Sequence, residues 1–159
     1  MTPGRSSACD QAVLQKYFES LMSGCTHALT VTSKEDQAQK SYLDRRSRLE
    51  ETIRIALRII DRCCFRKNHK RLGLRIDSVV VIEGGNPQKR MHAHLALTCP
   101  PAISSQQFRS YVQKAVSRCK SLGEQYEVSP IFDSAGWARY LAKEGIEALS
   151  PQCTHVAKR

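Results

Sequence analysis

The chain has no apolar run long enough to span a membrane and no signal peptide. Its seven cysteines are odd in number and show none of the paired spacings of a zinc site. These absences argue against a membrane protein, a disulfide-stabilised secreted domain and a zinc finger. We therefore expect a reduced, cytoplasmic protein.

The chain also lacks the nucleotide-binding loop Gly-x-x-x-x-Gly-Lys-[Ser/Thr], so it contains no ATP-driven motor. No low-complexity stretch, linker-like segment or internal repeat divides it. With 159 residues and 41% hydrophobic composition, it can bury one hydrophobic core. We expect a single domain over residues 1–159, with a short basic C-terminal tail.

Acidic residues are scarce: 15 Asp and Glu stand against 25 Lys and Arg, and the net charge is +10. This balance favours a polyanionic partner. Arginines recur at every fourth position from residue 54 to residue 66, so they share one face of an expected helix. Such a stripe is either a solvated helix face or a phosphate-binding one, and the pattern leaves both interpretations open.

Hydrophobic periodicity predicts helices at residues 9–22, 39–66, 104–120 and 135–145, and strands at residues 27–33, 74–83, 91–98 and 124–131. After the opening helix, the order is βαββαβ. This order predicts an α+β protein with a ferredoxin-like or RRM-like antiparallel sheet. If the helices pack on one face of that sheet, the other face stays free for DNA.

The segment Arg90-Met-His-Ala-His-Leu-Ala-Leu97 carries the strongest chemical signal. Residues two apart in a strand point to the same face, about 6.5–7 Å apart, so His92 and His94 could bind one metal ion. The alternate residues are apolar, which is typical of a strand with one core face and one functional face.

Glu83 ends the preceding predicted strand, just before the turn sequence Gly84-Gly-Asn-Pro87. If this is a hairpin in which Glu83 pairs with His92, the carboxylate lies on the face of both histidines. Glu83 is then the third ligand, although a solvated strand-end glutamate fits the spacing equally well. Two imidazoles and one carboxylate suit Mn²⁺ or Mg²⁺ with water and a phosphate oxygen, and Zn²⁺ would also bind.

Tyr140 lies in the last predicted helix, which Ser134 could cap and Gly145 could end. Trp137 and Lys143 fall three residues before and after Tyr140, on neighbouring parts of one face. A nearby ammonium favours the phenolate and can also hold a phosphate. A tyrosine in such a helix is otherwise more often a core residue, so its role depends on the metal motif.

Three motifs occur in a fixed order: Ala28-Leu-Thr-Val-Thr32, His92-Ala-His94 and Tyr140-Leu-Ala-Lys143. In this order they resemble the HUH endonucleases, specifically the rolling-circle replication initiators with a single tyrosine; conjugative relaxases generally carry the tyrosine first. The resemblance spans residues 26–146. Ala93 is small for its hydrophobic slot. The continuation His94-Leu-Ala-Leu97 differs from that of eukaryotic circular-DNA viruses, which favours a plasmid or phage in a bacterial host.

The resemblance implies metal-dependent, sequence-specific nicking and joining of single-stranded origin DNA through a 5′-phosphotyrosine intermediate. Glu83, His92 and His94 would hold the Mn²⁺ or Mg²⁺ ion. Tyr140 would attack the scissile phosphate, and Lys143 would assist the attack. The free 3′-hydroxyl would then prime rolling-circle replication.

Lys89 and Arg90 beside the histidine strand, and Arg139 beside Tyr140, are the expected contacts to the DNA backbone. Strand separation would require a helicase from the host or from a separate gene. A transposase of the same superfamily would share this chemistry. A non-catalytic DNA-binding regulator would keep the basic surface but would have no need of Tyr140. A phosphoesterase with two His-x-[Ser/Thr] motifs is a weak alternative, because the chain offers a single His-x-His.

Overall fold

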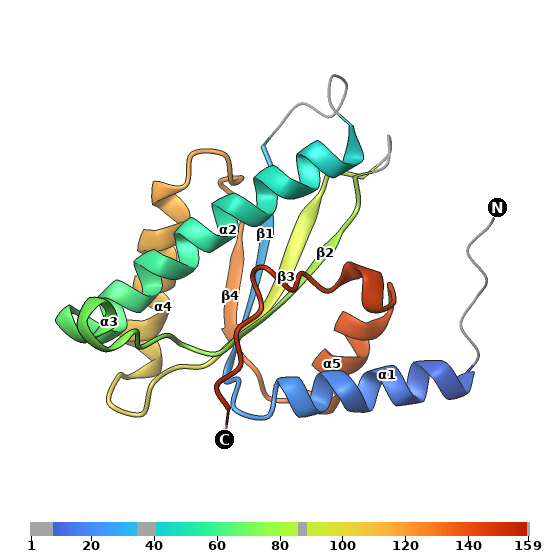
Figure 1. The fold of residues 1–159 in the computed structure, drawn as a ribbon, viewed down its shortest axis with the longest axis horizontal. Helices are drawn as coiled ribbons and strands as arrows, with labels where there is room; N and C mark the ends of the chain where they lie inside the picture. Colours follow the sequence, from blue (N-terminus) through green and yellow to red (C-terminus); the bar gives the residue numbers. More distant parts are fainter. Residues whose placement is uncertain (1–7, 35–40, 86–88, 159) are drawn as a thin grey trace.

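The computed structural model describes residues 8–34, 41–85 and 89–158 (Figure 1). The helices are α1 (Ala8–Leu21), α2 (Tyr42–Phe65), α3 (Lys67–Leu72), α4 (Ser105–Arg118), α5 (Ser134–Ala142) and the 3₁₀ helix η2 (Ile146–Ala148). The strands are β1 (His27–Thr32), β2 (Ser78–Glu83), β3 (His92–Leu97) and β4 (Glu127–Pro130). Each predicted helix and strand is therefore present, with shifted ends.

The four strands form one antiparallel sheet in the order β2-β3-β1-β4. After α1, the order of strands and helices along the chain is βαββαβ, which confirms the predicted α+β, ferredoxin-like fold. Strands β2 and β3 follow each other in sequence and pair directly, with β2 at the edge of the sheet and β3 between β2 and β1. The histidine strand is thus a central strand with a partner on each side.

Helices α2 and α4 cover one face of the sheet, as the prediction required (Figure 1). The core there contains β-branched and aliphatic strand residues packed against helix residues such as Ile53 and Phe108. The other face is not left free along its length. Phe18 of α1 and Leu141 of α5 pack there on Val79, Val81 and Ala96 of the strands, forming a second hydrophobic cluster. This face is therefore shared between hydrophobic packing and the polar groups of the candidate site.

The long predicted helix at 39–66 divides into α2 and α3, and its first two residues lie outside the described part. Ser41 caps α2 by accepting a hydrogen bond from the Asp44 amide at 3.2 Å. Arg66 interrupts the helix because its φ is 51°, in the left-handed region that non-glycine residues rarely adopt. The basic sequence after Phe65 therefore continues as a separate short helix.

Strand β2 starts at Ser78 rather than at residue 74. Just before it, the Ile76 amide donates to the Asp61 side chain of α2 at 2.8 Å, so this segment is bound to a helix rather than to a strand. Hydrophobic patterning alone does not reveal such a side-chain competitor.

Helix α5 has a different cap from the predicted one. The side chain of Asp133, not Ser134, accepts a hydrogen bond from the Gly136 amide at 2.9 Å. Since an Asp carboxylate also interacts favourably with the positive end of the helix dipole, Asp133 is well suited to this position. The helix ends at Ala142, and Gly145 follows with a φ of 86°.

We expect Asp133→Ala to lower the free energy of unfolding by about 1 kcal/mol, because it removes the cap of α5. Ser134→Ala is the matched control and should leave stability nearly unchanged. Urea unfolding followed by the fluorescence of the single tryptophan measures both. Equal loss in the two variants would contradict the assignment of Asp133 as the cap.

Candidate metal centre

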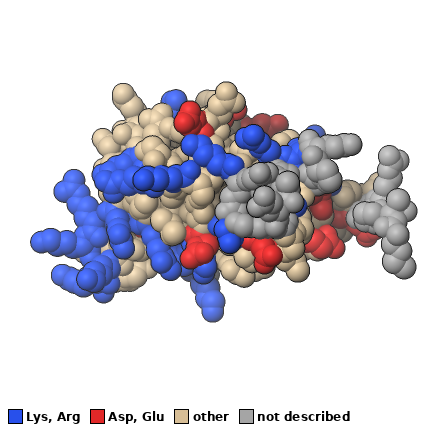
Figure 2. All heavy atoms as spheres, turned by 90° about the horizontal axis from the view of Figure 1, so that it is seen from above, with Lys and Arg blue, Asp and Glu red and all other residues tan. Residues whose placement is uncertain are grey.

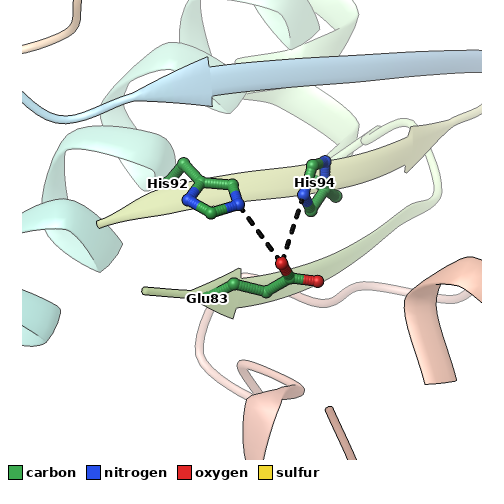
Figure 3. A group of neighbouring side chains, drawn as sticks. All are labelled: Glu83, His92 and His94. Carbon is green, nitrogen blue, oxygen red and sulfur yellow. Dashed lines mark hydrogen bonds and ion pairs between the residues drawn. The ribbon is translucent and has the colours of Figure 1, made fainter. Parts of the chain in front are cut away.

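The register of the β2–β3 hairpin brings Glu83 and the two histidines together. Glu83 pairs directly with His92, and Val81 pairs with His94, which is the pairing that a shared face requires. The intervening Ala93 belongs to the core against α2 and α4, so the alternation predicted for this strand is present. Figure 3 shows both imidazoles directed at the Glu83 carboxylate.

The three side chains lie within metal-binding distance of one another. Glu83 Oε2 is 3.2 Å from His92 Nε2 and 3.6 Å from His94 Nε2. One ligand atom from each residue lies within 4.8 Å of those of the other two. Glu83 and His94 are buried and each is only 4% exposed, whereas His92 is half-buried. The site therefore has a buried floor and a more accessible side.

Hydrogen bonds fix the orientation of both imidazole rings. His92 Nδ1 lies 3.0 Å from the Arg90 carbonyl oxygen, and His94 Nδ1 lies 2.9 Å from Thr30 Oγ1. Because each Nδ1 is bound to its own partner, each ring directs Nε2 toward Glu83. Metal-binding histidines are commonly held in this way by a partner on the other ring nitrogen.

Two further properties fit a bound cation. Glu83 Oε1 is buried and has no hydrogen-bond partner among the described residues, so the floor of the site holds an unsatisfied acceptor. Burial lowers the pKa of His94 to about 4, although the Glu83 charge opposes this shift. His94 is therefore neutral at pH 7, and its lone pair is free to bind a metal. The cluster could hold a divalent ion such as Mn²⁺ or Mg²⁺.

Two lysines also approach Glu83. Lys143 Nζ lies 3.3 Å and Lys89 Nζ 3.8 Å from Glu83 Oε2. Burial lowers the pKa of Lys143, but attraction to Glu83 and Tyr140 outweighs burial and raises its pKa overall. Lys143 is thus an ammonium at neutral pH. These ion pairs neutralise one carboxylate oxygen and leave Oε1 without a partner.

Tyr140 lies at the edge of the cluster. Its hydroxyl oxygen is 3.2 Å from His94 Nε2, and 37% of the residue is exposed. Its ring stacks on Trp137 with 5.1 Å between ring centroids, and Lys143 Nζ lies 4.1 Å from its ring centroid. The helical spacing of these three residues therefore groups them as the sequence predicts. A phenol, an ammonium and the Glu83-His92-His94 cluster are in mutual contact.

A hollow of about 380 Å³ opens beside Tyr140, between β1, β4 and the start of α5. Phe132, Trp137 and Tyr140 line it together with Ser129 and Asp133. Phe132 is 93% exposed, the largest exposure of any large apolar side chain described. The hollow thus offers aromatic surface next to the phenol.

The three residues predicted to contact the DNA backbone lie in two places. Lys89 and Arg90 are exposed at the entrance to β3, and Lys89 reaches Glu83. Arg139 is exposed on α5, and its Nε donates a hydrogen bond to Gln15 Oε1 of α1 at 3.4 Å. The sequence analysis missed Thr30 and Phe132. The polar face of the first strand could have indicated Thr30, whereas nothing in the sequence marked Phe132.

Neither a known family model, a curated protein nor a solved structure matches this chain. What is established is a small α+β fold with a Glu83-His92-His94 cluster, buried at Glu83 and His94, that is compatible with a metal site. Among the described residues, no helix is both long enough and apolar enough to cross a membrane.

We expect Thr30→Val to weaken Mn²⁺ binding about 10- to 100-fold, because the isosteric change removes the group that orients His94. Thr32→Val is the matched control, since Thr32 lies on the same strand face and is paired with His92 by register only. Isothermal titration calorimetry with Mn²⁺ measures both affinities. Unchanged affinity in Thr30→Val would show that the Thr30 hydroxyl does not orient a metal ligand.

Proposed function

We propose that this protein is a metal-dependent endonuclease and strand transferase that nicks and joins single-stranded DNA through a covalent bond to Tyr140. The observation that carries this proposal is the 3.2 Å separation between the Tyr140 hydroxyl and His94 Nε2. A structural tyrosine has no need of a buried carboxylate and two oriented imidazoles at its hydroxyl. A phosphoryl-transfer site needs this combination of nucleophile and cation site.

Glu83, His92 and His94 would hold the Mn²⁺ or Mg²⁺ ion. When bound, the ion supplies a Lewis acid for the nonbridging oxygens of the scissile phosphate. Tyr140 Oη attacks the phosphorus, a bond forms between them, and the bond from phosphorus to the 3′ oxygen breaks. The phenol releases one proton and the departing 3′ oxygen gains one, so the reaction is balanced and reversible. The 5′ phosphate remains on Tyr140 until a 3′-hydroxyl attacks it.

Lys143 has two functions in this scheme. Its ammonium, 4.1 Å from the centroid of the Tyr140 ring, would assist the attack by attracting the negative charge that develops on the phosphoryl group, and would then pair with the phosphate held on Tyr140. Lys89 and Arg90, exposed beside the histidine strand, would contact neighbouring phosphates. The aromatic hollow beside Tyr140 would hold a base of the single strand by stacking.

This chemistry would suit initiation of rolling-circle replication of a plasmid or phage, with a separate helicase opening the duplex. A transposase would use the same steps on other DNA. One observation favours a different function. Lys143 and Lys89 form ion pairs with Glu83 and so neutralise part of its carboxylate without a metal, as in a metal-independent DNA-binding regulator.

The decisive experiment incubates the protein with a pool of single-stranded DNA that includes its own origin, together with Mn²⁺. A denaturing gel should show a protein–DNA adduct. EDTA should abolish it because the cation site is emptied, and Tyr140→Phe should abolish it because the nucleophile is lost. Tyr42→Phe, at another part-exposed tyrosine, serves as the control and should form the adduct. An adduct with Tyr140→Phe, or none with the origin present, would contradict the proposal.

We expect Phe132→Ala to weaken binding to single-stranded DNA about tenfold, because stacking of a base on an aromatic ring contributes about 1–3 kcal/mol. Stability should not change, since Phe132 is almost fully exposed. Tyr17→Ala on α1, which removes another exposed aromatic side chain, is the control. Fluorescence anisotropy in EDTA compares a base-bearing oligonucleotide with an abasic one. Equal weakening for both oligonucleotides would contradict base stacking.

A further inference from the structure

The net positive charge of the chain comes from two segments. Residues 62–76 and 105–120 contain ten of the 25 Lys and Arg and none of the 15 Asp and Glu. The rest of the chain has fifteen basic and fifteen acidic residues, so it is neutral. The whole net charge of +10 therefore resides in these two segments.

The fold places these segments side by side. The first runs from the end of α2 through α3, the second covers α4, and α2 packs against α4. On the face in Figure 2, Lys and Arg side chains gather at the left end, which is the end where α3 lies in Figure 1. We call this region the helical basic surface. Its ten cations are all exposed: Arg62, Arg66, Lys67, Lys70, Arg71, Arg75, Arg109, Lys114, Arg118 and Lys120.

Two rows of these cations border a hollow. Arg62 lies in the last turn of α2, and Arg66, one turn later, caps the end of that helix. Lys114 and Arg118 are one turn apart on α4. The four line a hollow of about 350 Å³ between the helices. Like charges one turn apart destabilise a helix, so this arrangement has a cost in the free protein.

Acidic side chains do not relieve that cost. In the described part of the chain, Arg75 is the single member of the helical basic surface that forms an ion pair, with Asp61 at 3.8 Å. The other nine have no carboxylate partner there. A helix face that is merely solvated would tolerate acidic residues among its arginines. Here both segments lack acidic residues, although they are far apart in the sequence.

We propose that the helical basic surface binds the sugar–phosphate backbone of double-stranded DNA. Sites for single strands combine cations with exposed aromatic rings. The described residues of the helical basic surface include no exposed aromatic ring, and Tyr111 in the hollow is half-buried. Cations on rigid helices without stacking groups are suited to a duplex, which carries one negative charge per about 1.7 Å of its axis.

This surface is separate from the candidate nuclease site. Helices α2 and α4 cover one face of the sheet, whereas His94 and Tyr140 meet beside α5 on the other. In Figure 1, α3 and α5 lie toward opposite sides of the molecule. A duplex on these helices would leave Tyr140 and His94, on the other face, accessible to a single strand. The protein would thereby hold the double-stranded flank of a site while it acts on a single-stranded segment.

The test measures binding of the full chain to a labelled blunt-ended 20-base-pair duplex by fluorescence anisotropy in EDTA. Arg62→Gln combined with Arg118→Gln should weaken binding about tenfold or more. It should also reduce the slope of log affinity against log salt by about 1.8, since each phosphate contact contributes about 0.9. Lys16→Gln combined with Arg139→Gln removes the same charge from exposed positions of α1 and α5, which pack on the other face of the sheet. This control should leave duplex affinity within about twofold.

Equal weakening in the two double variants would overturn the proposal, because net charge alone would then explain binding. Absence of duplex binding by the unmodified protein would overturn it as well, and binding to phosphatidylserine vesicles instead would assign the surface to a membrane. The assay needs neither metal nor cleavage. Duplex binding and adduct formation can therefore fail independently, and each result bears on its own proposal.

Discussion

The candidate site depends on the pairing of Glu83 with His92 across the β2–β3 hairpin. A shift by one residue would move the glutamate to the opposite face and bury its carboxylate in the core. The apolar residues that alternate with the histidines prevent such a shift, because they must remain against α2 and α4. Hydrophobic packing on one face of β3 thus determines which polar side chains meet on the other face.

The charge balance in this site is compatible with the proposed phosphodiester substrate. Glu83 supplies one negative charge to a region where Lys143 and Lys89 already lie within 4 Å of its carboxylate. A divalent ion held by the cluster would leave the region strongly positive, and a phosphodiester would reduce that excess. The lysines that neutralise Glu83 in the free protein can then pair with the phosphate instead. The net charge of the chain lies elsewhere, on the helical layer, so affinity for nucleic acid and chemistry on it would use separate surfaces.

The sequence predicted the helices, the strands and the Glu83-His92-His94 grouping because all three depend on alternation and helical spacing. It did not predict the interruption at Arg66, which is a backbone conformation that propensities disfavour. Nor did it predict the Asp133 cap, since two capping residues stand next to each other and geometry decides between them. Thr30 was missed because its contact with His94 depends on the register of strands distant in sequence. The packing of α1 and α5 on the second face required knowledge of where two amphipathic helices meet.

Pulsed electron paramagnetic resonance of Mn²⁺ added to the protein tests the central claim most directly. If Glu83, His92 and His94 bind the ion, the spectrum should show couplings to two imidazole nitrogens, with one coupling lost in His92→Ala and the other in His94→Ala. A spectrum identical to that of aqueous Mn²⁺, or nitrogen couplings that persist when both histidines are replaced, would contradict the account.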